Sequence, residues 1–216
     1  MKAVIFDLDG VICFTDKLHY KAWKNIADEE GIYFDEKIND RLRGVSRMES
    51  LDIILEKADR TYSFDEKKEI AEKKNDIYVS LLDTMSEKDL DANVKNVLDT
   101  LRSRGTLLAI GSSSKNTKKI LEKLGLKDFF DAVSDGTNIT KSKPNPEVFL
   151  KAAEMLGIKP VEAVVVEDAL SGIDAALAGG FECVGIGEAA MHPKVTYPLK
   201  DLADLPEIVL RKNADI

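Results

Sequence analysis

The stretch KAVIFDLDG, residues 2–10, decides the fold, because a short apolar run ends there in two aspartates and a glycine. A continuous apolar run is typical of a strand buried on both faces of a parallel sheet, and such strands present polar side chains at their carboxyl ends. Two later stretches repeat this form, LLAIGS at 107–112 and AVVVED at 163–168. We therefore expect three buried parallel strands, a fourth at 183–186 and a weaker fifth at 132–133.

Helical segments alternate with these strands along the chain. The segments 116–124, 147–156 and 170–178 each carry spaced apolar residues and are followed by a glycine, which is the usual stop signal of a helix. Alternating strands and helices form βαβ units, which build a parallel sheet covered by helices on both faces. The predicted fold class is therefore α/β, with a Rossmann-like, doubly wound parallel sheet.

The stretch 16–86 has a different pattern from the rest of the chain. It contains no strand-like run, is rich in lysine and glutamate, and repeats its apolar residues at helical intervals, which predicts four or five helices. An all-helical block inserted after the first strand indicates a cap domain. We expect a catalytic α/β core made of residues 1–14 and 87–216, and a helical cap made of residues 15–86.

The composition of the 216 residues excludes several classes of protein. Apolar residues make up 44% of the chain, which is normal for a globular core and too many for a disordered chain. The 31 basic and 39 acidic residues give a net charge of −8 with no long basic run, so nucleic acid is not an expected partner. This charge and a single cap are compatible with a monomer.

The N-terminal apolar run and the two cysteines bear on location. The run at 3–6 meets Asp7 before it is long enough for a signal-peptide core or a membrane span. Cys13 and Cys183 lie far apart and match no metal-binding spacing or disulfide framework. We therefore expect a cytoplasmic protein with two reduced thiols and no membrane partner.

Asp7 and Asp9 form the first candidate for chemistry. If the backbone stays extended, their side chains point to the same face and bring two carboxylates into one small space. That crowding is costly unless a cation lies between them or one carboxyl group holds a proton. A metal ion beside a nucleophilic carboxylate satisfies both conditions, whereas the ordinary structural alternative is an exposed Asp-x-Asp-Gly turn.

Polar side chains also follow the later strands. Ser112 comes after the second buried strand, Lys143 stands in the rigid stretch KSKPNP, and the third strand is followed by Glu167 and Asp168. Taken alone, Ser112 is an ordinary helix cap and Lys143 a hydrated surface lysine. At the shared edge of a parallel sheet, however, oxygen ligands favour Mg²⁺, and Mg²⁺ with a lysine favours a phosphoryl group. Together these residues predict Mg²⁺-dependent phosphoryl transfer.

In order and position, four of these stretches resemble the signature motifs of the haloacid dehalogenase superfamily, and the resemblance covers the whole chain. They are FDLDG at 6–10, Ser112, Lys143 with Pro144, and Glu167 with Asp168. The resemblance implies that Asp7 is the nucleophile, forming an aspartyl-phosphate, and that Asp9 is the general acid and base. It also implies that Ser112 and Lys143 hold the transferring phosphoryl group.

The same resemblance implies one Mg²⁺ ion per chain. Its ligands would be the carboxylates of Asp7 and Asp168 and the main-chain oxygen of Asp9, with Glu167 as an adjacent or direct ligand. Because Asp9 must carry a proton when it donates to a leaving group, we expect its pKa to be raised in the closed site.

Four further stretches are similar to the β-phosphoglucomutase family within this superfamily. They are TDKLH at 15–19 with the following Ala22 and Trp23, LRGVSRMES at 42–50, KKND at 73–76 and SSSKN at 112–116, of which RGVSR and SKN are the most diagnostic parts. Members of that family interconvert β-D-glucose 1-phosphate and D-glucose 6-phosphate, with β-glucose 1,6-bisphosphate as intermediate and activator. The resemblance therefore implies a small sugar-phosphate substrate and an Mg²⁺-dependent isomerase that works as a phosphomutase.

In such an enzyme the cap must hold the phosphate that is not being transferred. The resemblance gives this role to Arg47, whose planar guanidinium binds phosphate with two hydrogen bonds. It gives Thr15, His19 and Lys74 the role of coupling cap closure to Asp9, so that sugar rather than water triggers catalysis. The other implied substrate-binding residues are Trp23, Gly44, Val45, Ser46, Ser50, Asn75, Ser113, Ser114, Lys115 and Asn116.

Two residues depart from the pattern of that family. Phe14 stands where an acidic residue is usual, and Cys13 stands where threonine or serine is usual. We assign neither residue a catalytic role. Both lie at the predicted junction of core and cap, so they are expected to affect the hinge.

Three alternatives remain open. A sugar-phosphate phosphatase on the same scaffold would let water attack phospho-Asp7 and would depend less on Arg47. A cap lysine also suggests phosphonate hydrolysis through a Schiff base, but Lys74 stands beside Lys73 and Glu72 and is expected to remain hydrated, which disfavours this chemistry. A receiver-like switch also uses a strand-end aspartate, Mg²⁺ and lysine, yet it would need no helical insertion of this length.

Overall fold

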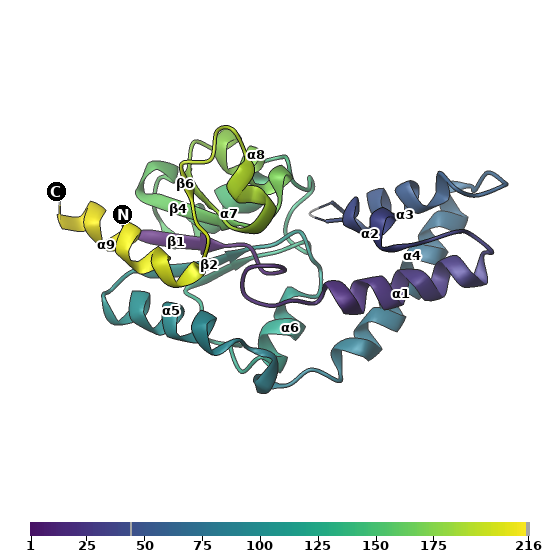
Figure 1. The fold of residues 1–216 in the computed structure, drawn as a ribbon, viewed down its shortest axis with the longest axis horizontal. Coiled ribbons are helices and arrows are strands. Elements are labelled where there is room, and N and C mark those ends of the chain that lie inside the picture. Colours follow the sequence, from purple (N-terminus) through teal and green to yellow (C-terminus); the bar gives the residue numbers. More distant parts are fainter. Residues whose placement is uncertain (44, 215–216) are drawn as a thin grey trace.

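The computed structural model describes residues 1–43 and 45–214, and its centre is a parallel sheet flanked by helices (Figure 1). The strands are β1 (Ala3–Phe6), β2 (Leu107–Gly111), β3 (Ala132–Ser134), β4 (Ala163–Glu167), β5 (Glu182–Gly185) and β6 (Tyr197–Pro198). They form one sheet in the order β3-β2-β1-β4-β5-β6, and every neighbouring pair is parallel. The predicted α/β fold class is confirmed.

Strand β1 lies inside the sheet, between β2 and β4. Phe6 is in register with Ile110 of β2 and with Val166 of β4, so these three strands reach the same edge together. The chain runs from β1 outward to β2 and β3 and then returns to the opposite side of β1 as β4. Ligands of open α/β sheets bind where the strand order reverses in this way, at the carboxyl ends of the strands.

Strand residues alternate between two helical layers. The helices of the core are α5 (Ala92–Ser103), α6 (Thr117–Lys123), α7 (Glu147–Leu156), α8 (Leu170–Ala178) and α9 (Leu205–Ala214). Val4 and Phe6 belong to the apolar cluster under α5, α6 and α9, while Ala3 and Ile5 belong to the cluster under α7 and α8 (Figure 1). Both faces of the sheet are therefore covered, which explains why its strands are continuously apolar.

The elements expected at the sheet agree closely with those observed. The helices expected at 147–156 and 170–178 are present as α7 and α8, and the weak strand expected at 132–133 is β3. Helices α5 and α9 and the short strand β6 were not predicted. The remaining helical turns are 3₁₀ segments at Glu87–Asp89, Pro160–Glu162, Gly187–Met191 and Leu202–Asp204.

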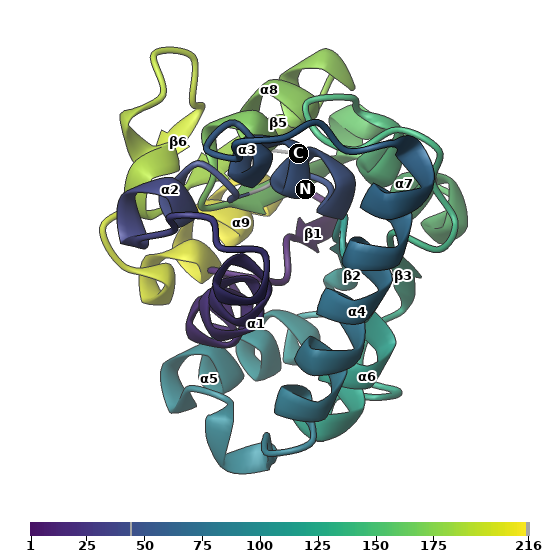
Figure 2. The same cartoon turned by 90° about the vertical axis from the view of Figure 1, so that its right-hand side faces the viewer.

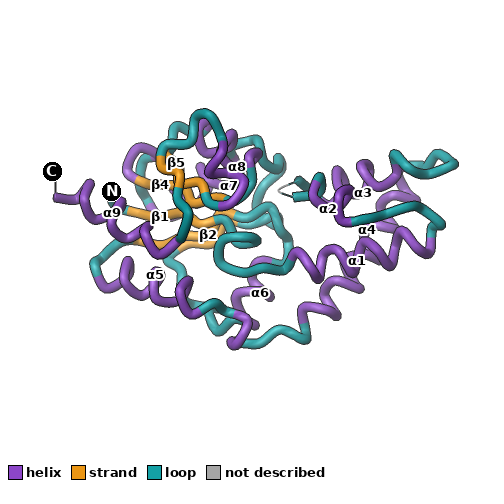
Figure 3. Tube along the Cα trace, in the orientation of Figure 1, coloured by secondary structure: helices purple, strands orange, loops and turns teal. Residues whose placement is uncertain are grey.

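The stretch between β1 and α5 is helical. Its helices are α1 (Asp16–Glu29), α2 (Glu36–Asp40), α3 (Arg47–Leu55) and α4 (Phe64–Leu82). Figure 3 shows only helix and loop in this part of the molecule, and Figure 2 shows it in front of the strand ends. These helices have their own apolar core, which includes Trp23, Phe34, Leu51 and Ile54. The predicted helical insertion is present, and its proposed limits at 15 and 86 stay a prediction.

Two expectations about the cysteines and membranes can be compared with the structure. Cys13 and Cys183 are both buried and free, as expected of two separate thiols. None of the helices in the described ranges is both long and apolar enough to cross a membrane. The expected location in the cytoplasm and the monomeric state stay predictions.

Candidate active site

Carboxylates gather where β1 and β4 end. Asp7 follows β1 and Asp168 follows β4, whose last residue is Glu167. Oxygens of the three carboxylates lie within 4.8 Å of one another. The Nζ atom of Lys143 donates hydrogen bonds to Asp7 Oδ1 and to Glu167 Oε1, and the lysine is 3% exposed. The predicted strand-end residues therefore form one buried acidic cluster around a single ammonium group.

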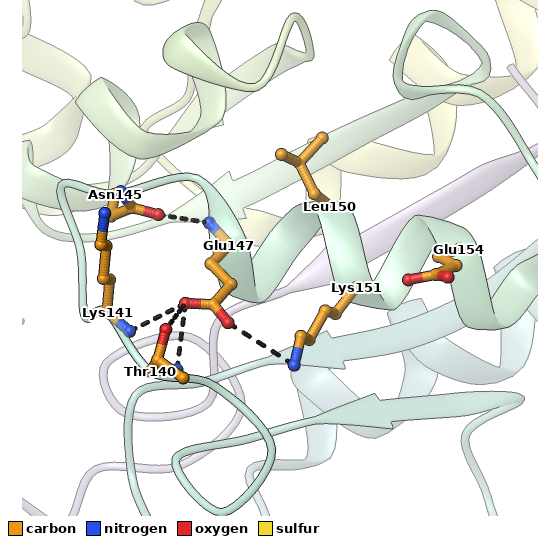
Figure 4. Close-up of a pocket in the computed structure, with 7 residues that line it drawn as sticks. All are labelled: Thr140, Lys141, Asn145, Glu147, Leu150, Lys151 and Glu154. Carbon is orange, nitrogen blue, oxygen red and sulfur yellow. Dashed lines mark hydrogen bonds and ion pairs between the residues drawn. The ribbon is translucent and has the colours of Figure 1, made fainter.

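Lys143 comes from the loop between β3 and α7, and hydrogen bonds on both sides of Lys143 fix that part of the loop. Glu147, in the first turn of α7, accepts hydrogen bonds at Oε2 from Thr140 N at 3.0 Å and Lys141 N at 2.8 Å (Figure 4). Asn145 Oδ1 accepts a hydrogen bond from Glu147 N at 3.1 Å. These bonds hold the segment that carries Lys143, and the residues that make them line the pocket shown in Figure 4.

Two glycines let the acidic side chains pack against the backbone. A Cβ atom on Gly10 would lie 2.0 Å from Asp168 Oδ2, and a Cβ atom on Gly172 would lie 1.9 Å from the carboxyl carbon of Glu167. Gly10 also has φ of +85°, which favours glycine. Glu167 Oε2 further accepts hydrogen bonds from Asp168 N and Ala169 N, each at 3.2 Å. The positions of both carboxylates thus depend on the absence of side chains at these glycines.

The electrostatics of the cluster call for a second cation. Burial raises the pKa of Asp168 to about 7, and burial also raises the pKa of Glu167. Burial disfavours the charge on Lys143, but the carboxylates of Asp7 and Glu167 outweigh it and raise the pKa of the amine, which stays protonated. In the described part of the chain, Lys143 is the one cation in contact with these acids. A compact set of carboxylate oxygens with excess negative charge fits Mg²⁺.

Asp9 lies beside this cluster in a chain of hydroxyl groups. The Thr15 hydroxyl donates to Asp9 Oδ1 and accepts a hydrogen bond from the Tyr78 hydroxyl at 3.0 Å. Burial raises the pKa of Asp9 to about 6; the Thr15 hydrogen bond opposes the shift and the charge of Asp7 adds to it. The expected rise of this pKa is confirmed. Cys13, to which we assigned no role, donates from Sγ to Asp9 Oδ1 at 3.7 Å.

His19 and Lys74 pair beneath the cap helices. Lys74 Nζ lies 2.8 Å from His19 Nδ1, and the His19 ring stacks on Tyr78 with centroids 4.0 Å apart. Lys74 is 3% exposed, and its ammonium lies 4.8 Å from the centre of the Trp23 ring. The expectation that Lys74 remains hydrated is wrong. Lys73 and Glu72 remain exposed, and Lys73 pairs with Glu29 at the end of α1, whereas Lys74 packs against His19 and Trp23 of the same helix.

Tyr78 is a site residue that our sequence analysis missed. It donates to Thr15, stacks on His19 and lies 4.6 Å from the Lys74 ammonium. Its position four residues after Lys74 places both side chains on one face of α4. That spacing is the signal that would have found it.

A polar bridge joins the helical insertion to the core. Asn75 Oδ1 on α4 accepts hydrogen bonds from Arg47 Nη2 at 2.8 Å and from Asn116 Nδ2 at 3.0 Å. Asn116 follows the loop after β2, where Ser114 Oγ accepts a hydrogen bond from Asn116 N at 3.2 Å. Arg47 is half-buried at the start of α3, and its hydrogen bond to Asn75 uses only Nη2 of a guanidinium that carries five N–H donors.

The loop after β2 supplies hydroxyl groups to the same region. Ser112 is 2% exposed, and its hydroxyl accepts a hydrogen bond from Ser114 N at 3.1 Å. The buried hydroxyl of Ser113 has no hydrogen-bond partner among the described residues. Ser46 instead caps α3, since its hydroxyl accepts from Glu49 N at 3.3 Å. Its predicted contact with substrate stays a prediction.

One cleft of about 980 Å³ connects most of these residues. Of the predicted site residues, it is lined by Asp7, Asp9, His19, Trp23, Val45, Ser46, Arg47, Ser50, Lys74, Ser112, Ser113, Ser114, Lys115, Asn116, Lys143, Glu167 and Asp168. Thr15 and Asn75 stand behind the wall, where they bond to residues that line it. Gly44 lies outside the described residues. The cleft therefore has the acidic cluster on the core side and Arg47 on the helical side.

This arrangement defines a class of protein. Residues 1–180 match the haloacid dehalogenase-like hydrolase family, and the chain belongs to that family. The β-phosphoglucomutase of Bacillus subtilis strain 168 is 42% identical over 207 residues, which are 95% of this chain and 92% of that protein. The phosphorylated carbohydrates phosphatase of Thermotoga maritima is 32% identical, over 84% of this chain and 83% of that protein.

A solved structure supports the same relationship. The crystal structure of β-phosphoglucomutase (pgmB) from Clostridium difficile superposes with a TM-score of 0.86 at 36% identity, covering 100% of both chains. The core and the helical insertion therefore occur together in a related protein that matches this chain from end to end.

Proposed function

We propose that the chain is a β-phosphoglucomutase, interconverting β-D-glucose 1-phosphate and D-glucose 6-phosphate. The observation that carries this proposal is the presence of two anion-binding groups in one cleft. Lys143 lies in the acidic cluster of the core, and Arg47 lies on the helical side beside Asn75 and Asn116. A mutase must hold one phosphate while it transfers the other, whereas a phosphatase needs a single phosphate site.

In the first half of the reaction, an Asp7 carboxylate oxygen attacks the phosphorus atom of the donor. The bond from phosphorus to the leaving sugar oxygen breaks, and an acyl phosphate forms on Asp7. Asp9 supplies the proton that the leaving oxygen takes, because burial holds its carboxyl group protonated up to about pH 6. Lys143 and the Ser112 hydroxyl bind the oxygens of the phosphoryl group during transfer.

In the second half, Asp9 works in the opposite direction. It accepts the proton from a sugar hydroxyl, whose oxygen then attacks the acyl phosphate and forms β-glucose 1,6-bisphosphate. The bisphosphate then reorients in the cleft and transfers its other phosphoryl group to Asp7. At each stage Arg47 binds the phosphate that is not being transferred, with help from the loop at 113–116.

The metal would be held by the carboxylates of Asp7 and Asp168 and by the main chain at Asp9, with Glu167 beside it. When bound, Mg²⁺ supplies charge neutralisation at the transferring phosphoryl group. Lys143 donates hydrogen bonds to both Asp7 and Glu167 and so holds their carboxylates in place.

Water must be kept from the acyl phosphate if the protein is to work as a mutase. We propose that Thr15, His19 and Lys74 connect closure of the helical cap to Asp9. The hydrogen bonds from Tyr78 to Thr15 and from Thr15 to Asp9 support this, because they join α4 of the insertion directly to the candidate general acid.

A sugar-phosphate phosphatase is the second candidate. The Thermotoga maritima relative is named as a phosphatase of phosphorylated carbohydrates, and it matches most of this chain. In this alternative, water attacks phospho-Asp7, and the role of Arg47 is limited to substrate binding.

The test is one assay that separates the two candidates. The protein is incubated with Mg²⁺, β-glucose 1-phosphate and a trace of β-glucose 1,6-bisphosphate, and glucose 6-phosphate and free phosphate are measured in the same tube. Glucose 6-phosphate in large excess over free phosphate is the expected result. Free phosphate without glucose 6-phosphate would establish the phosphatase. The absence of both products would overturn both substrate assignments.

A further inference from the structure

The amine of Lys74 is in an unusual environment for a lysine. Lys74 lines the cleft, and its Nζ atom lies 2.8 Å from His19 Nδ1 and 4.8 Å and 4.6 Å from the ring centres of Trp23 and Tyr78. Among the residues that the structure describes, no carboxylate forms an ion pair with it. A buried lysine without an acidic partner carries its charge at a cost.

The charged and titratable groups that face Lys74 come from every element packed around it. They are His19 on α1, Arg47 on α3, Tyr78 on α4 and Asp9 in the loop after β1. Burial and the charge of Arg47 lower the pKa of Lys74 to about 7, and the charge of Asp9 opposes them. Near neutral pH about half of these amines therefore carry no proton, compared with roughly one in a thousand for an ordinary lysine.

We propose that Lys74 is a carbonyl-reactive amine that forms a reversible Schiff base with phosphorylated aldehydes entering the cleft. The phosphate preference rests on the proposed function, since it uses Arg47 as the phosphate-binding group. The reactivity of the amine itself depends only on the surroundings of Lys74. An aldehyde bound in this way would block the sugar site.

The reaction balances without any further reagent. The lone pair of the neutral Lys74 amine attacks the aldehyde carbon, and one proton moves from the nitrogen to the oxygen to give a carbinolamine. The carbinolamine then loses its hydroxyl group together with the second N–H proton as water, which leaves a carbon–nitrogen double bond. His19 Nδ1, 2.8 Å from the amine, is placed to take the proton that the nitrogen loses and to return it to the departing hydroxyl group. Water reverses every step.

Phosphate makes the reaction selective because of where Arg47 lies. Arg47 donates a hydrogen bond to Asn75, the residue that follows Lys74 on α4. Its guanidinium charge is close enough to lower the pKa of Lys74. A phosphate bound at Arg47 would hold an attached aldehyde near the amine and raise its effective concentration. The same aldehyde without phosphate lacks this advantage.

The experiment uses pyridoxal 5′-phosphate as the probe and the unphosphorylated aldehyde pyridoxal as its comparison. The whole protein is treated with each, reduced with borohydride, and digested for peptide mass mapping. Lys68 is the internal control, because it lines the same cleft but its side chain is 63% exposed. We expect the phosphorylated probe to label Lys74 at least about tenfold faster than Lys68 near neutral pH.

The pH profile of labelling tests the proposal without any substitution. Labelling of Lys74 should reach half its maximum near pH 7, as a pKa of about 7 for its amine requires. Equal labelling of the two lysines, or a Lys74 profile that rises above pH 9, would overturn the proposal.

Matched variants complete the test. Lys74→Arg should remove the dominant label, Lys68→Arg should leave it in place, and near-ultraviolet circular dichroism confirms that each variant is folded. Arg47→Ala should remove the advantage of the phosphorylated probe over pyridoxal, and an unchanged advantage would contradict the phosphate preference. Labelling of Lys74 in a protein that fails the sugar-phosphate assay would contradict the proposed function and leave the amine reactivity established.

Discussion

Thr15 shows how single residues serve the chemistry at the expense of local rules. It stands at the start of α1, where a threonine hydroxyl usually caps the first turn, yet it makes no such bond. Its hydroxyl donates to Asp9 instead and is held in place by Tyr78. The Thr15 hydroxyl therefore makes a hydrogen bond to the candidate general acid in place of a helix-capping bond.

The nucleophile assignment makes the sharpest prediction at this scale. Asp7→Asn keeps the size of the side chain and removes the attacking carboxylate, so we expect phosphoryl transfer to fall by at least about 1,000-fold. Formation of glucose 6-phosphate in the presence of β-glucose 1,6-bisphosphate measures the loss. Substantial turnover in a folded Asp7→Asn protein would show that another group accepts the phosphoryl group.

Arg47 should matter for one phosphate and not for the other. Arg47→Ala removes charged hydrogen bonds to the phosphate that is not transferred, so the apparent affinity for β-glucose 1,6-bisphosphate should fall by about 10- to 100-fold. Hydrolysis of a simple acyl phosphate should change little. The control is Arg41→Ala, because Arg41 pairs with Glu56 on the surface at 2.8 Å and does not line the cleft.

Equal loss of mutase and hydrolase rates in Arg47→Ala would contradict the role of Arg47. It would indicate that Arg47 supports the cleft as a whole, through its hydrogen bond to Asn75.

At the scale of elements, the packing of α8 on β4 positions the acidic cluster. Glu167 ends β4, and Gly172 lies in the first turns of α8 with its Cα against the Glu167 carboxyl group. No side chain fits between helix and carboxylate. The helix therefore packs directly on the Glu167 carboxyl group, which accepts a hydrogen bond from Lys143. Lys143 also donates a hydrogen bond to Asp7.

Gly172→Ala tests that contact. The new methyl group would overlap the Glu167 carboxyl group, so the helix or the carboxylate must move, and we expect the free energy of unfolding to fall by about 1–3 kcal/mol. Urea denaturation measures the change, and the displaced Glu167 should also lower activity. The control is Ala178→Ser, an exposed position in the same helix. A Gly172→Ala protein with normal stability and activity would show that the site tolerates movement of Glu167.

At the scale of the whole molecule, negative charge accumulates at the site as well as over the chain, whose net charge is −8. Burial raises the pKa of Asp9 to about 6 and that of Asp168 to about 7. Both carboxyl groups are therefore neutral at low pH in the metal-free protein. Their stabilising contribution is present at low pH and is lost as the pH rises through these values.

Mg²⁺ should reverse this trend. Mg²⁺ binds carboxyl groups in their ionised form. Below about pH 7 it must displace protons from them and binds more weakly, and above that pH it meets less competition from protons. We expect the rise in melting temperature on exchanging EDTA for Mg²⁺ to be larger at about pH 7.5 than at about pH 5.5. Asp168→Asn should abolish most of the difference. A Mg²⁺ effect that is independent of pH, or that survives in Asp168→Asn, would place the metal elsewhere.

Much of this architecture was predictable because it depends on short-range patterns. The apolar runs before Asp7, Gly111 and Glu167 are long enough only for buried strands, and the glycines after α7 and α8 mark where those helices end. Parallel strands must expose their carboxyl ends together. The meeting of Asp7 with Glu167 therefore followed from order along the chain.

Other features required the tertiary structure. Strand β6 contains a proline and is two residues long, so its sequence carries no strand signal, and it forms only because β5 offers an edge. Lys74 stands in a highly charged stretch of α4, and helical periodicity alone does not reveal that α1 covers it. Its burial arises from Trp23 and His19, more than fifty positions earlier in the chain.

The amino-acid sequence by itself thus determined the fold class and the residues of the acidic cluster, since both depend on which residue types follow each apolar run. Only the tertiary structure decided protonation and reactivity. The pKa of Asp9, the hydrogen bond from Tyr78 to Thr15 and the contact of the Lys74 amine with His19 depend on distances between elements that are remote in sequence. Burial and electrostatic interaction act through space, and only the packed chain sets those distances.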